Sequence, residues 1–217
     1  MEIQPIRFGD EGQAATRELL RRFDASTAAD PALRGRLAAL EALDRQYGGL
    51  ARIERDEVEE LVAAILMQLA ALEEPDLVIG TALWAQRHEV PVTAPERVVN
   101  ALAQRSNAAA DKQELAAVFG LMQGFIAHVA PRLSADLERS NPERPWRILH
   151  ANLAITAIRT EDAAMMDFAF DALDAALPDE RQGFYAEALA VALAPGIAPG
   201  VREKIAARHA QWTANMR

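Results

Sequence analysis

The sequence contains no cysteine, and this absence excludes several kinds of chemistry. Disulfides, thiolate nucleophiles and cysteine metal sites are all ruled out. The histidines do not fill the gap, because no two are four residues apart and none follows a glutamate by three residues. Glycine-rich phosphate loops and the Gly-x-Ser-x-Gly pattern are also missing. The sequence therefore predicts no metal and no cofactor, and it offers no local catalytic motif.

Basic charge and long apolar runs are also scarce. The 217 residues carry 23 Lys and Arg against 32 Asp and Glu, a net charge of -9, and the basic residues form no stripe for a phosphate backbone. The most apolar run, Leu61 to Leu72, contains Gln68 and is shorter than the roughly 20 residues of a membrane-crossing helix. The first residues show no secretory signal pattern. We expect no nucleic-acid partner, no membrane partner and a cytoplasmic location.

Alanine and leucine dominate what remains, and apolar residues recur at spacings of three and four. This periodicity predicts an all-α fold of about ten helices; only the first eight residues read as extended. The expected helices cover about 10–24, 30–47, 75–88, 91–105, 111–130, 145–159, 161–177, 179–194 and 199–215, with one more starting near 54 and a short one at 134–139. Pro131 is expected to end or kink the helix that Asp111 caps.

The links between these helices are short, so neighbouring helices are expected to pack antiparallel as hairpins. The result is either a stack of helix pairs, an α-α superhelix, or an irregular bundle. The stretch NPERP, from Asn141 to Pro145, is the most loop-like in the chain. It separates an N-terminal helical part, residues 1–140, from a C-terminal part, residues 141–217, which we expect to pack together as one domain.

Three aspartates share one face of the helix expected at 161–177. Asp167, Asp171 and Asp174 follow one another at spacings of four and three, and apolar side chains cover the rest of the helix. Carboxylates on one straight helix diverge, so they make a poor cage for a cation. We expect a solvated strip on a core helix.

The window from Arg147 to Glu180 resembles one tetratricopeptide repeat. The match rests on Leu153 followed by the small Ala154, on the turn after Thr160, on Phe170 and on Pro178. Where the repeat usually has an aromatic residue near its start and a tyrosine in its first helix, this chain has His150 and Ala157. The resemblance implies paired helices that stack, with the first helix of the pair lining a concave surface.

The resemblance also points to residues for binding. In such a repeat, the first helix meets extended peptides, which implies partner contacts by Arg147, His150, Asn152 and Arg159. Asn152 and Arg159 lie seven residues apart on one stripe of that helix. An arginine forms a forked pair with a carboxylate, which suits an acidic peptide or a free C-terminus. The competing interpretation is that Arg159 binds its own helix end and Asn152 an adjacent helix.

Three hypotheses about function follow. The first is a non-enzymatic helical-repeat protein, of a bacterial type from its alanine and arginine usage, that binds a protein or peptide partner through a concave helix face. The second is an all-α enzyme or small-ligand sensor with its site in an interhelical cavity, formed by His128, His150 and the tryptophans. The third is a structural subunit whose apolar helix faces complete a homo-oligomer. No catalytic residue is predicted.

Overall fold

Most of the described helices begin at a proline or next to an aspartate. The computed structural model describes residues 30–46, 56–194 and 196–214, and over these residues the chain is all-helical, with nine helices and no strand. They are α2 (Pro31–Gln46), α3 (Asp56–Ala71), α4 (Pro75–Arg87), α5 (Pro95–Asn107), α6 (Lys112–Leu133), α7 (Pro145–Thr160), α8 (Ala163–Ala176), α9 (Arg181–Ala192) and α10 (Pro199–Ala214). The helix expected at 10–24 and the extended start lie outside the described residues.

Two kinds of residue mark where these helices begin: a proline in the first turn, or an aspartate at the N-cap. Proline lies in the first turn of α4, α5 and α7, where its missing N–H costs no helical hydrogen bond. Asp111 caps α6 by accepting from the Glu114 N–H at 2.8 Å, and Asp162 caps α8 by accepting from the N–H groups of its second and third residues. Each cap satisfies backbone donors that have no partner inside the helix.

Two sequence expectations about the segment after α6 are wrong. Of the two alternatives for Pro131, the one in which it ends the helix is wrong. The helix continues through Pro131 to Leu133, because a proline one turn from the end removes a single hydrogen bond. The short helix expected at 134–139 is a series of turns instead. Asp136 takes a left-handed φ of 45° there, and its carboxylate binds Arg144. The side-chain bond to a residue eight positions later holds the segment as a loop.

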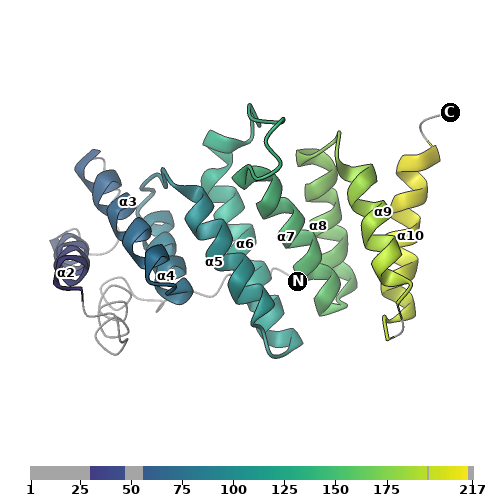
Figure 1. The fold of residues 1–217 in the computed structure, drawn as a ribbon, viewed down its shortest axis with the longest axis horizontal. Helices are drawn as coiled ribbons and strands as arrows, with labels where there is room; N and C mark the ends of the chain where they lie inside the picture. Colours follow the sequence, from purple (N-terminus) through teal and green to yellow (C-terminus); the bar gives the residue numbers. More distant parts are fainter. Residues whose placement is uncertain (1–29, 47–55, 195, 215–217) are drawn as a thin grey trace.

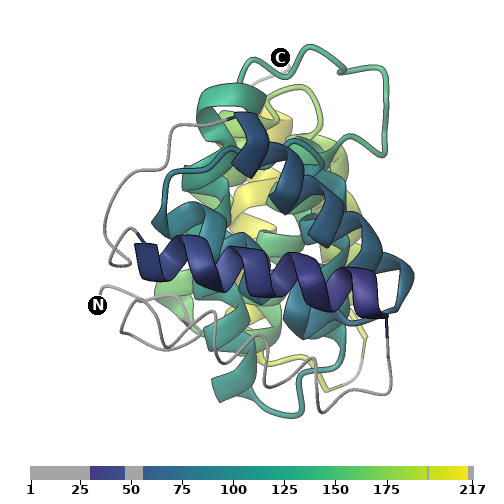
Figure 2. The ribbon, with the colours of Figure 1, turned by 90° about the vertical axis from the view of Figure 1, so that its left-hand side faces the viewer.

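The helices follow one another along the long axis of the molecule, from α2 at one end to α10 at the other (Figure 1). Seen along that axis, α2 lies across the near end with the other helices behind it (Figure 2). Most neighbours in sequence pack together, and α8 and α9 meet through the rings of Phe170 and Tyr185. In addition, α5 contacts α3 and α7, while α4 contacts α6. Helix α7 packs on both α5 and α6, so the parts of the chain before and after residue 140 share contacts.

One continuous apolar core runs from Leu33 in α2 to Ile205 in α10. Leu153, Ala154 and Phe170, three of the residues on which the repeat resemblance rests, are fully buried in it. The Phe170 ring packs edge-on against Tyr185 of α9, with ring centroids 5.3 Å apart. Within the described residues, α6 has the length and composition of a membrane-crossing helix, a property that core helices share.

The aspartate strip of α8 faces α10 rather than only water. The pairs are Lys204 with Asp167, Arg208 with both Asp171 and Asp174, and Trp212 with Asp174. Asp174 is 8% exposed, so the expected solvated strip holds only for its first two members, Asp167 and Asp171. Lys204, Arg208 and Trp212 of α10 lie four residues apart and so reach the three aspartates of α8. These pairs join the α7–α8 hairpin to the α9–α10 hairpin.

Candidate functional site at the two ends of α7

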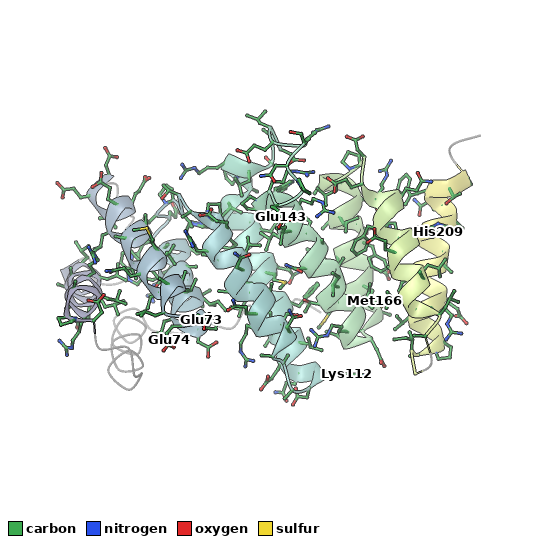
Figure 3. All side chains as sticks on the ribbon, in the orientation of Figure 1. Glu73, Glu74, Lys112, Glu143, Met166 and His209 are labelled. Atoms are coloured by element: carbon green, nitrogen blue, oxygen red, sulfur yellow. The ribbon has the colours of Figure 1, made fainter. Side chains whose placement is uncertain are left out.

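All four predicted partner-binding residues lie on α7, but the structure separates them into two regions. Near the start of α7, Arg147 lines a cleft of about 440 Å³ together with Arg144 and Glu180; we call it the arginine cleft. Near its end, Arg159 lines a second cleft of about 410 Å³, which we call the Arg159 pocket. Figure 3 labels Glu143, beside the arginine cleft, in the upper half of the molecule and Lys112, which lines the Arg159 pocket, at its lower edge.

Arg144 organises the arginine cleft and has no donor to spare. Its Nε and Nη2 donate to the two carboxylate oxygens of Asp136 at 2.6 and 3.1 Å, and Nη2 also donates to Glu180. Its Nη1 donates to the carbonyls of Arg139 and Asn141. The side chain is 5% exposed, and the hydrogen bond with Asp136 raises its pKa. All five guanidinium protons thus hold the loop after α6 and the turn before α9 in place.

Arg147 completes this network from one turn further along. Its Nε donates to Glu180 and its Nη1 donates to the Pro142 carbonyl at 3.0 Å. Burial alone would raise the pKa of Glu180, but the hydrogen bonds from Arg144 and Arg147 outweigh burial and lower it. Glu180 therefore occupies the place that a partner carboxylate would take between these two arginines.

His150 is buried one turn after Arg147 and does not line the arginine cleft. It is 3% exposed, its ring packs against Trp146 at 4.4 Å between centroids, and neither ring nitrogen has a hydrogen-bond partner among the described residues. Burial lowers its pKa to about 4. The imidazole is therefore neutral at physiological pH, and a partner bound to the outside of α7 does not reach it. His128 is elsewhere, and its Nε2 donates to the Val90 carbonyl at 3.0 Å.

Asn152 lies midway along α7 on its outer side. The side chain is half-buried and makes no hydrogen bond within the described part of the chain. Ile155, one turn later, is 44% exposed and so offers an apolar surface to a partner. Asn152, Ile155 and Arg159 follow at spacings of three and four and so form one stripe, which we call the α7 stripe.

Arg159 ends the α7 stripe and is only partly satisfied. Its Nη1 donates to the carbonyl of Ser106 at 2.8 Å, at the end of α5, and to the Ser106 hydroxyl at 3.2 Å. The expectation that it binds a helix end thus applies to α5 and not to α7 itself. Its Nε and Nη2 have no partner among the described residues, and it forms no ion pair with them. Arg159 is therefore a half-buried cation with donors left over.

The walls of the Arg159 pocket combine apolar and charged groups from distant segments. The large apolar side chains are Leu115 of α6, Ile158 of α7, Ile197 in the connection before α10, and Val201 in the first turn of α10. Lys112 and Glu161 face each other at the pocket, with Nζ and Oε2 2.6 Å apart. The pocket thus offers a guanidinium with unused donors beside an apolar wall, which suits a carboxylate attached to an apolar group.

Sequence reasoning identified Arg159 but not the rest of its pocket. Lys112 and Glu161 are 49 residues apart, and Ile197 belongs to the connection before α10, so no local spacing links them. Within the described residues, no group of three or more histidines and acids is arranged to hold a metal ion.

Comparison with protein-family models, with curated proteins and with solved structures finds no match.

Proposed function

We propose that this chain is a non-enzymatic helical-repeat protein that binds a protein partner through α7, taking the free C-terminal carboxylate of that partner on Arg159. The apolar wall of the pocket receives the partner's last side chain. The preceding residues of the partner lie along the α7 stripe. The function is binding, and no step of it breaks or forms a covalent bond.

The contacts between the helices support the repeat arrangement in this proposal. Helices α3, α5 and α7 contact one another in order, α4 contacts α6, and α8 is joined to α10 through its aspartates. Contacts between every second helix are what two rows of stacked hairpins produce, as in an α-α superhelix. In such a stack, one row leaves a continuous helix face open to a partner.

The single observation that carries the proposal is the incomplete pairing of Arg159. The spare Nε and Nη2 donors of Arg159 are open to solvent, since they are not among the buried side-chain atoms without a partner, so a ligand can reach them. Arg159 donates only to Ser106, through one of its three nitrogens. A carboxylate from outside the chain would complete it, and the guanidinium binds such a group in a forked geometry.

The α7 stripe gives the partner a direction. Seven residues separate Asn152 from Arg159, which corresponds to about 10 Å along a helix. An extended peptide spans that distance with about three residues. Its last side chain then meets the pocket wall, an upstream side chain meets Ile155, and Asn152 provides both a donor and an acceptor for its backbone.

The test is a direct binding measurement with a labelled hexapeptide that ends in leucine and carries a free carboxylate. Fluorescence anisotropy is compared with that of the same peptide amidated at its C-terminus. We expect the amide and the Arg159→Met variant each to weaken binding by roughly tenfold or more, the value of a charge-assisted pair. Arg139→Met is the matched control, since Arg139 is an exposed arginine of the other cleft. Equal affinity for acid and amide would overturn the proposal.

A second candidate function is sensing of a small carboxylic acid at the same place. The observation that favours it is the volume of the Arg159 pocket, about 410 Å³, which lies in the range of small-molecule sites. If 4-methylpentanoate raises the melting temperature in a concentration-dependent way while the peptide does not bind, the small ligand is the right one. If neither binds, both candidates fail.

A further inference from the structure

Two carboxylates line the Arg159 pocket, and what holds them decides whether Arg159 is open to a ligand. Asp111 is engaged at the start of α6, where its Oδ1 accepts from the Glu114 N–H at 2.8 Å. Glu161 is only two residues from Arg159, yet it pairs with Lys112 of α6 at 2.6 Å and not with Arg159. A carboxylate that lines the same pocket as the guanidinium is therefore paired with a lysine from another helix.

We propose that Lys112 is a positioning residue of this pocket: by holding the Glu161 carboxylate, it keeps the spare donors of Arg159 available for a ligand carboxylate. Lys112 does this without touching the ligand. The inference rests on the proposed function of the pocket as a carboxylate site, and it adds the residue that controls the site's occupancy.

The position of Glu161 makes it a competitor whenever Lys112 is absent. Glu161 ends α7 with a left-handed φ of 57°, so its backbone is fixed at the rim of the pocket while its side chain remains 40% exposed. The residues that line the pocket carry two positive and two negative formal charges. Removal of Lys112 leaves two carboxylates against one arginine. Asp111 is engaged by the start of α6, so Glu161 is the carboxylate that gains an ion pair by turning to Arg159.

A double-variant cycle separates this role from direct contact with the ligand. Binding of the leucine-ended peptide is measured for the wild type, Lys112→Gln, Glu161→Gln and the combination of both. We expect Lys112→Gln to bind roughly three- to fivefold more weakly and Glu161→Gln at least as tightly as the wild type. The combined variant regains the wild-type affinity to within about twofold, because the Glu161 carboxylate that would compete for Arg159 is removed together with Lys112.

Lys204→Gln is the matched control. Lys204 forms an ion pair of the same length, 2.6 Å, with Asp167 on α8, and neither residue lines the pocket. The Lys204→Gln variant removes the same charge from the protein as Lys112→Gln does, and we expect its affinity for the peptide to be unchanged. If Lys112→Gln binds like the wild type, or if the combined variant remains as weak as Lys112→Gln alone, the positioning role is overturned.

A measurement without ligand keeps this inference separate from the proposed function. The Nε–H signal of Arg159, assigned by its loss in Arg159→Met, is followed by ¹H–¹⁵N NMR in the free protein. We expect Lys112→Gln to shift this signal as Glu161 turns to the guanidinium, and the combined variant to return it to the wild-type position. A shift without any peptide binding would refute only the proposed function. Peptide binding with no shift would refute only the role of Lys112.

Discussion

The two ends of α7 present arginines in opposite states. At its start, Arg144 uses all five of its protons on groups of the same chain and is almost fully buried. At its end, Arg159 uses one nitrogen on Ser106 and borders an apolar-walled pocket. A saturated arginine contributes to the free energy of unfolding, whereas an arginine with spare donors is available to a ligand. The residue type alone does not decide which role applies; the number of donors already engaged does.

The largest expected effect is a difference in unfolding free energy between variants of these two arginines. Arg144→Met leaves the 7%-exposed carboxylate of Asp136 without its forked partner, and we expect the free energy of unfolding to fall by about 3 kcal/mol. Arg159→Met loses only the contacts with Ser106, and we expect a loss of about 1 kcal/mol. Urea unfolding followed by circular dichroism measures both. Equal losses would mean that the two arginines do not differ in the way their donors indicate.

The helices, and the placement of Asn152 and Arg159 on one face of α7, were predictable from the sequence. The periodicity of alanine and leucine and the proline or aspartate starts predicted the helices, since helix ends are decided by local chemistry. Asn152 and Arg159 were placed on one stripe by their spacing alone. The all-α prediction is confirmed over the described residues, while the repeat type and the partner stay predictions.

What the sequence did not contain is the pairing between distant segments. The turns at 134–139 depend on Asp136 reaching Arg144, and a propensity argument that considers only neighbouring residues predicts a helix there instead. The aspartates of α8 looked solvated because their partners lie on α10, 34 to 38 residues away. His150 looked available for binding because helical spacing does not report which faces other helices cover.

The buried imidazole of His150 makes the stability of the region at the start of α7 depend on pH. The pKa of His150 is about 4 in the folded chain, against an ordinary value of 6.5. Between those values the unfolded chain binds more protons than the folded one, so the free energy of unfolding falls as the pH falls. Complete passage through this window costs up to about 3 kcal/mol.

His150→Phe removes the titrating group and keeps a ring against Trp146. We expect this variant to lose less stability than the wild type between pH 6.5 and pH 4, with similar stability at pH 7.5. Thermal unfolding at a series of pH values measures the difference. If the two proteins lose stability in parallel, the burial of a neutral imidazole is not what makes this region sensitive to acid.

The smallest expected effect on stability concerns Asn152, which lies between the two regions. Its side chain makes no hydrogen bond within the described residues, and alanine favours helix more than asparagine does, so Asn152→Ala should change the free energy of unfolding by less than about 0.5 kcal/mol. The same variant should weaken the leucine-ended peptide about threefold if the side chain bonds the peptide backbone. Unchanged affinity would confine the partner to Ile155 and the Arg159 pocket. Because the change leaves the fold intact, any loss of affinity reports contact with the partner alone, which substitution of a saturated residue such as Arg144 cannot do.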